Sequence, residues 1–127
     1  METRDFVYID DAVNATIAGI ETELLDCLCI NVGTGISTNV LSVAKILKQL
    51  YNSSSEIYVS GNYRLGDIRH NNADITVLKE KLKYQPIVHF EDGIKQFSEW
   101  VKTQEISDTG LSYKKSLIEM RTRGLYK

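Results

Sequence analysis

The sequence lacks the features that mark membrane-spanning proteins and secreted, disulfide-rich proteins. It has no apolar run near the ~20 residues that a membrane-spanning helix requires. The charged residues 1–5 are not followed by the apolar run of about 7–15 residues that a secretory signal contains. Only two cysteines occur, Cys27 and Cys29, and they lie too close in the chain for an unstrained disulfide. We therefore expect two buried, reduced thiols in a cytoplasmic protein that does not bind a membrane.

Neither sign of charge is in large excess. The chain has 15 Lys and Arg against 17 Asp and Glu, a net charge of −2, which argues against a dedicated nucleic-acid surface. The two histidines, His70 and His89, do not obviously supply the further ligands that a zinc site at the cysteines would need, so we predict no metal site. A length of 127 residues allows one domain with a modest core.

Five stretches carry apolar residues at helical spacing and are predicted helices. Asp10 or Asp11 can cap the first, and Ser37, Thr38 or Asn39 the second, by accepting backbone hydrogen bonds. The expected inner faces are Val13, Ile17, Ile20 and Leu24; Val40, Val43, Ala44, Leu47, Leu50 and Tyr51; Ile75, Leu78 and Leu82; Ile94, Phe97, Trp100 and Val101; and Leu117 with Met120. Gly124 is expected to end the last helix.

Three short apolar stretches, residues 6–9, 27–32 and 57–59, are predicted strands because they are β-branched and aromatic or form compact apolar runs. Strands that alternate with helices favour an α/β fold. Three short strands are few for an independent sheet, so we expect some of them to join a sheet whose other strands lie outside this sequence.

Three polar motifs invite a functional interpretation. Gly33-Thr34-Gly35 follows a predicted strand, but Thr38 stands where a dinucleotide-binding loop needs its third glycine, so a plain turn is favoured. Arg4 could hold a phosphate through paired N–H donors, or it could be an ordinary surface arginine. In residues 64–69, the arginines could neutralise phosphate charge and Asp67 could accept hydrogen bonds from ribose hydroxyls. The alternative is a solvated loop with internal ion pairs.

In this order and spacing, the motifs resemble nucleotide-sugar 4-epimerases and their dehydratase relatives, in the extended short-chain dehydrogenase/reductase family. The matching segments are residues 4–11 (RDFVYIDD), 30–35 (INVGTG), 64–69 (RLGDIR), 73–75 (ADI), 84–86 (YQP) and 90–94 (FEDGI), with a tail at 116–125. The resemblance implies the C-terminal substrate-binding portion of that α/β fold, made of helices with a few short strands. The N-terminal Rossmann half, which carries the cofactor loop, is then expected to be absent.

The resemblance assigns roles to three residues. Arg4 and Arg64 match arginines that contact the nucleotide diphosphate, and Asp67 matches the acid that holds the ribose. It implies a substrate-binding lobe over residues 1–103 and a partly helical extension over 104–127. The expected ligand is a UDP- or dTDP-sugar, and NAD is expected only in a full-length relative.

Catalysis by this chain alone is not expected. The family's Tyr-x-x-x-Lys pair abstracts a sugar hydroxyl proton while hydride passes to NAD, and none of the seven tyrosines here has a lysine four residues later. We therefore predict the binding portion of a 4-epimerase, with a 4,6-dehydratase or reductase fragment as an alternative. A third hypothesis is a non-enzymatic binding or assembly module. Apolar surface around Phe6, Tyr8, Leu28 and Ile30 would then bind a second copy or the missing half.

Overall fold

The computed structural model describes residues 1–23, 27–105 and 109–127. Within these residues the chain is mostly helical, with two strands of two residues each. The elements in chain order are β1 (Thr3–Arg4), α1 (Ile9–Glu21), β2 (Thr38–Asn39), α2 (Val40–Leu50), α3 (Thr76–Leu82), α4 (Phe90–Lys102) and α5 (Gly110–Thr122). Among them no helix is long and apolar enough to cross a bilayer. The expected α/β alternation is therefore only partly correct.

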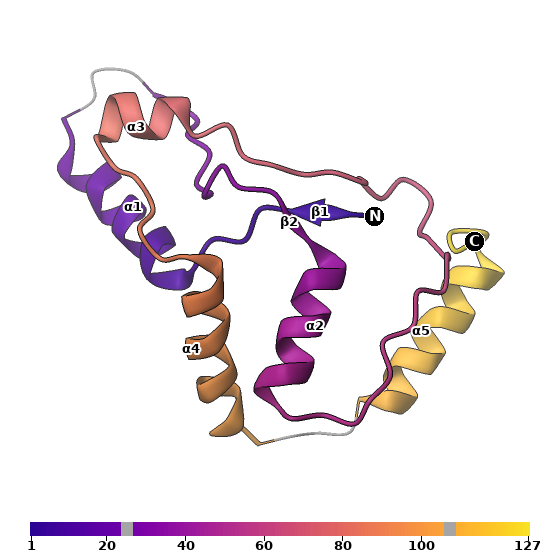
Figure 1. Ribbon diagram of the computed structural model, residues 1–127. Helices are drawn as coiled ribbons and strands as arrows, with labels where there is room; N and C mark the ends of the chain where they lie inside the picture. The colour runs from indigo at the N-terminus through magenta and orange to yellow at the C-terminus, as the bar shows by residue number, and fades with distance from the viewer. Residues whose placement is uncertain (24–26, 106–108) are drawn as a thin grey trace.

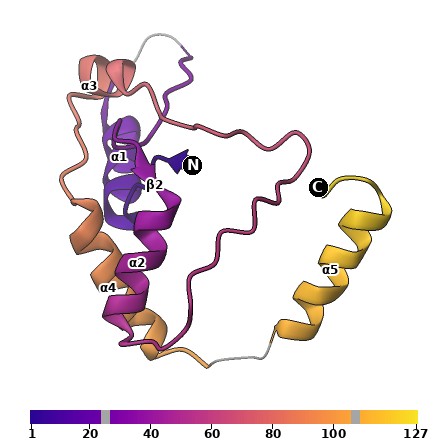
Figure 2. The same cartoon turned by 45° about the vertical axis from the view of Figure 1, so that its right-hand side comes forward.

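The helices lie in two pairs with a fifth set apart. α1 lies beside α3 and α2 beside α4, with the short antiparallel pair of β1 and β2 between the two groups (Figure 1). A long segment leaves the end of α2, runs up between α2 and α5 and returns across the molecule to α3 (Figures 1 and 2). This segment contains residues 64–69, so the fold carries the second polar motif back towards β1.

The core lies between α1 and α3 and is small. Its buried members are Ala15, Ile75, Leu78 and Leu82, which confirms the predicted inner face of the third helix. α1 contributes mainly small side chains here, with Ala18 packed at the edge. Because alanines let two helices approach closely, this face suits the short α3.

The predicted inner face of α1 is wrong. Val13, Ile17 and Ile20 are exposed by 47%, 44% and 79%, and Leu24 lies outside the described residues. The same holds in α4, where Ile94 is buried but Phe97 and Trp100 are more than half exposed. An apolar face becomes an inner face only where another element packs on it. Among the described residues no element covers the α1 stripe, and α2 covers only part of the apolar face of α4.

The cap of the second helix is confirmed and that of the first is wrong. Asn39 accepts a hydrogen bond from the Leu41 N–H at 2.8 Å and so caps α2. α1 instead begins at Ile9, with Tyr8 as its N-cap residue. Asp11 lies inside the first turn of α1, fully buried, where it binds other segments.

The predicted strands at 6–9, 27–32 and 57–59 do not form. Within the described part of the chain, the one strand pair is β1 with β2, in which Thr3 lies opposite Asn39 and Arg4 opposite Thr38. Cys27 and Cys29 are both exposed, which corrects the expectation of buried thiols. A strand needs a neighbour to satisfy its backbone, and these segments have none among the described residues.

Candidate functional site

The structure brings together Arg4, Arg64 and Asp67, the three residues that the sequence singled out. The Arg4 guanidinium lies 3.4 Å from one Asp67 oxygen, and the Arg64 guanidinium lies 2.9 Å from the other. Arg4 belongs to β1, some sixty residues before the other two. The carboxylate of Asp67 is therefore held between two arginines that come from distant parts of the chain.

A glycine turn positions the loop that carries Arg64 and Asp67. The Asp67 N–H donates to the Arg64 carbonyl at 3.1 Å, and Gly66 between them has φ +83°. This combination is typical of a type II turn, whose third position requires a left-handed residue such as glycine. The turn brings the Asp67 carboxylate back beside the Arg64 side chain.

Backbone hydrogen bonds attach the same loop to β1. The Thr3 N–H donates to the Arg69 carbonyl at 3.1 Å, and the Asn71 N–H donates to the Thr3 carbonyl at 3.1 Å. The Arg4 guanidinium adds a bond of 3.1 Å to the Arg69 carbonyl. Arg4 is thus oriented by the backbone as well as by Asp67.

The charge and exposure of the cluster leave it open to a ligand. Two guanidinium groups surround one carboxylate, and the side chains of Arg64 and Asp67 are 62% and 39% exposed. Exposed ion pairs of this kind typically stabilise a fold by only about 0–1 kcal/mol. The expected internal ion pairs of a solvated loop do form, but they leave a net positive charge facing solvent.

A cavity of about 700 Å³ opens beside the cluster. Arg64, Asp67 and Arg69 line it, while Arg4 reaches it only through its contact with Asp67. Tyr58, Tyr63 and Tyr126 supply aromatic walls. Its volume lies within the range of about 300–1,000 Å³ that is common for small-molecule sites.

Asp5 uses the amides of the glycine turn at residues 33–35. Its carboxylate accepts hydrogen bonds from the Thr34 hydroxyl and from the N–H groups of Thr34, Gly35 and Ala73, at 2.6–3.2 Å. Partial burial raises the pKa of Asp5, but these hydrogen bonds outweigh it and hold the pKa below its ordinary value. A carboxylate thus occupies the amides that a cofactor phosphate would need, so this turn does not fit a dinucleotide.

Asp11 is a second carboxylate with several hydrogen-bond donors around it, and the sequence did not reveal this role. It accepts hydrogen bonds from the Tyr84 hydroxyl at 2.8 Å, the Ile87 N–H at 3.0 Å and the Val88 N–H at 2.9 Å. Burial raises the pKa of Asp11, and the three donors lower it to a value below normal overall. The same burial, with the Asp11 contact, raises the pKa of Tyr84. Asp11 joins α1 to the segment before α4.

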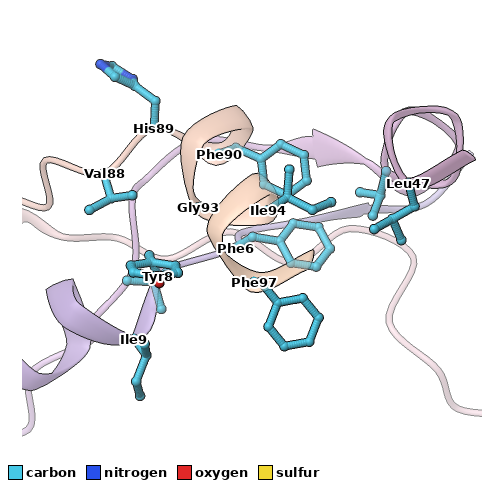
Figure 3. A pocket seen from close by; sticks show the side chains of 12 residues that line it. Phe6, Tyr8, Ile9, Leu47, Val88, His89, Phe90, Gly93, Ile94 and Phe97 are labelled. Carbon is cyan, nitrogen blue, oxygen red and sulfur yellow. The ribbon is translucent and has the colours of Figure 1, made fainter. Parts of the chain in front are cut away.

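An apolar pocket of about 350 Å³ lies between α2, α4 and the segment that leads into α1. Phe6, Phe90 and Ile94 lie close together in it, and Leu47 faces them from α2 (Figure 3). The ring centroids of Phe6 and Phe90 lie 5.3 Å apart. The pocket offers few polar groups, so it suits an apolar side chain better than a charged ligand.

Known proteins resemble the chain in sequence. A dTDP-L-rhamnose 4-epimerase of Burkholderia thailandensis is 33% identical over 99 residues, which are 78% of this chain and 27% of that enzyme. A UDP-N-acetyl-alpha-D-glucosaminuronate decarboxylase of Bacillus cytotoxicus is 34% identical over 112 residues, 82% of this chain and 34% of that enzyme. No family model matches the chain.

Solved structures of nucleotide-sugar epimerases also resemble the chain. The UDP-glucose 4-epimerase of Thermotoga maritima, solved with UDP-glucose, is 36% identical with a TM-score of 0.70, over 80% of this chain and 32% of that one. The chain is related to the NAD-dependent nucleotide-sugar epimerases. A second such relative, the UDP-glucuronic acid 4-epimerase of Bacillus cereus with UDP-glucuronic acid and NAD, is 29% identical with a TM-score of 0.68, over 80% of this chain and 32% of that one.

The chain spans about a third of the length of these epimerase and decarboxylase relatives. The expected family resemblance is therefore confirmed over most of this chain and part of each relative. The described fold matches part of the epimerase fold.

Proposed function

We propose that this chain binds the nucleotide diphosphate of a UDP- or dTDP-sugar, as the C-terminal substrate-binding portion of a sugar 4-epimerase. Arg4 and Arg64 bind the diphosphate, and Asp67 binds the ribose hydroxyls. Residues 1–103 form the substrate-binding lobe, and 104–127 form its extension. A dehydratase, decarboxylase or reductase with the same grip on the nucleotide is the alternative.

One observation carries the proposal: two arginines from distant segments flank a single carboxylate at the wall of a cavity of about 700 Å³. A guanidinium offers paired N–H donors that match two phosphate oxygens. A carboxylate offers about four lone-pair sites, of which the arginines use two, so Asp67 can still accept from a ribose diol. Arg69 adds a positive charge to the same wall.

The proposal assigns binding to this chain and no turnover of its own. No tyrosine here is followed by a lysine at the fourth position, so the family's proton-abstracting pair is missing from the sequence. The amides of residues 34 and 35 are engaged by Asp5. NAD chemistry is therefore not assigned to the residues of this chain.

Calorimetry with UDP-glucose tests the proposal. Arg64→Gln and Asp67→Asn should each weaken binding about tenfold, because each removes a charge-assisted contact. Arg123→Gln is the matched control: Arg123 is also exposed and ion-paired, to Glu119, but does not line the cavity, so affinity should stay within about twofold. No binding by the wild-type chain at millimolar ligand, or equal affinity in all variants, would contradict the proposal.

The exposed apolar surface favours a second candidate function, assembly with another polypeptide. The chain exposes 10,046 Å², whereas a compact monomer of 14.4 kDa exposes roughly 6,800 Å². The stripe of Ile9, Val13, Ile17 and Ile20 on α1 accounts for part of this surface. Phe6 and Leu28, which the sequence suggested, are exposed too, while Tyr8 and Ile30 are partly buried. The cover would be a second copy or the remainder of an epimerase fold.

A further inference from the structure

The last residues of the chain pair with the loop that carries Arg64. The Tyr63 N–H donates to the Lys127 carbonyl at 2.7 Å, and the Lys127 N–H donates back at 2.9 Å. The Leu65 N–H donates to the Leu125 carbonyl at 2.8 Å. We call this arrangement, residues 125–127 against 63–65, the tail pairing. It is antiparallel and joins segments some sixty residues apart.

The register of the tail pairing places Tyr126 beside Arg64. Residues 63 and 127 exchange both hydrogen bonds, so the next pair along, Arg64 and Tyr126, is a non-hydrogen-bonded pair. Side chains of such a pair lie on one face, with Cβ atoms about 4.5–5.5 Å apart. Both residues line the cavity of about 700 Å³.

The end of α5 fixes the direction of the tail. Gly124 has φ +67°, its N–H donates to the Arg121 carbonyl at 3.0 Å, and the Leu125 N–H donates to the Met120 carbonyl at 2.9 Å. These two bonds are those of a Schellman motif, which ends a helix and turns the chain. The Arg121 guanidinium lies 5.5 Å from the centre of the Tyr126 ring and holds the ring in place.

Resting on the proposed function, we propose that Tyr126 stacks on the base of the bound nucleotide. A nucleoside diphosphate carries its base one ribose away from its first phosphate, so an aromatic wall next to Arg64 and Asp67 is within its span. Every base has a π-face on which an aromatic ring can stack. Tyr58 and Tyr63 also line the cavity but are 83% and 53% exposed, whereas Tyr126 is half-buried and held by the tail pairing on both sides.

The test compares UDP with inorganic pyrophosphate as calorimetric ligands of the whole chain. Tyr126→Leu should weaken UDP binding about tenfold and leave pyrophosphate binding unchanged, because only UDP has a base to stack. Tyr126→Phe keeps the ring and should stay within about twofold of wild type for both ligands. Tyr113→Leu removes an exposed tyrosine from α5 that does not line the cavity, and it should change neither affinity.

The outcomes separate this inference from the proposed function. If the wild-type chain binds UDP and Arg64→Gln weakens it, but Tyr126→Leu does not, base stacking is wrong and the diphosphate site stands. Equal weakening of UDP and pyrophosphate by Tyr126→Leu would also overturn stacking, since it would show that the side chain only supports the loop. No binding of either ligand by the wild-type chain would remove both proposals.

Discussion

At the scale of single residues, two aspartates hold the chain together. Asp5 accepts four hydrogen bonds from residues 34, 35 and 73, and Asp11 accepts three from residues 84–88. Neither role was predictable from the sequence, because the donors are mostly backbone N–H groups that come close only after folding. Arg64 and Asp67, by contrast, stood out because charged residues flanked a glycine within six positions.

Asp11→Asn should lower the free energy of unfolding by about 2 kcal/mol, because an amide NH₂ would then face one of the three donors. Urea denaturation measures this as a lower midpoint with an unchanged slope. Asp10→Asn is the matched control, since Asp10 is the neighbouring residue of the same turn but is exposed, and it should stay within about 0.5 kcal/mol of wild type. Equal losses in both variants would contradict the assigned role of Asp11.

The lowered pKa values of Asp5 and Asp11 predict a loss of stability in acid. Both carboxyls have folded-state pKa values below the ordinary 3.8, so below that pH the unfolded chain binds more protons than the folded one. Stability is therefore fully present above the ordinary value and falls as the pH drops through and below it. Urea midpoints across the acid range should fall less steeply for Asp11→Asn than for wild type. Parallel curves would show that Asp11 does not contribute to the loss.

At the scale of elements, the positions of the helices along the chain were easier to predict than which face of each helix is buried. All five helices form where helical spacing predicted them, and Gly124 ends α5 as expected, because spacing, caps and stops are local in the sequence. The predicted inner face of α1 was wrong because no helix or strand of the described residues covers its bulky stripe, Val13, Ile17 and Ile20, while Ala15 packs against α3. The strands failed for the same reason, since a strand depends on a neighbour that its own residues do not specify.

Gly124→Ala should loosen the tail pairing without unfolding the chain. A residue with a Cβ at φ +67° is strained by about 1 kcal/mol, which disfavours the turn from α5 into residues 125–127. Hydrogen exchange should become faster at the N–H groups of Tyr63, Leu65 and Lys127. Ser112→Ala, an exposed substitution early in α5, is the control and should leave these rates unchanged. Unchanged rates in Gly124→Ala would mean that the pairing does not depend on this turn.

At the scale of the whole molecule, the dominant feature is the large solvent-exposed area of the chain. The chain exposes roughly 3,200 Å² more than a compact monomer of its mass, several times the ~800 Å² that one partner typically buries in a stable interface. The relatives are about three times as long as this chain, so their folds contain elements with no counterpart here. Both facts predict that α1 and α4 gain partners when the chain associates.

Replacing the α1 stripe should reduce association without destabilising the chain, because these side chains contribute little to the core. We expect the wild-type chain to self-associate at high concentration and to bind a hydrophobic dye. Val13→Gln with Ile17→Gln should shift light scattering towards the monomer. Leu111→Gln with Ile118→Gln removes two apolar residues from α5 that are more exposed than Val13 and Ile17, and it should still have a smaller effect, since α5 carries no such stripe. If the wild-type chain is a sharp monomer that binds no dye, or if both double variants behave alike, the α1 stripe is not the surface through which this chain associates.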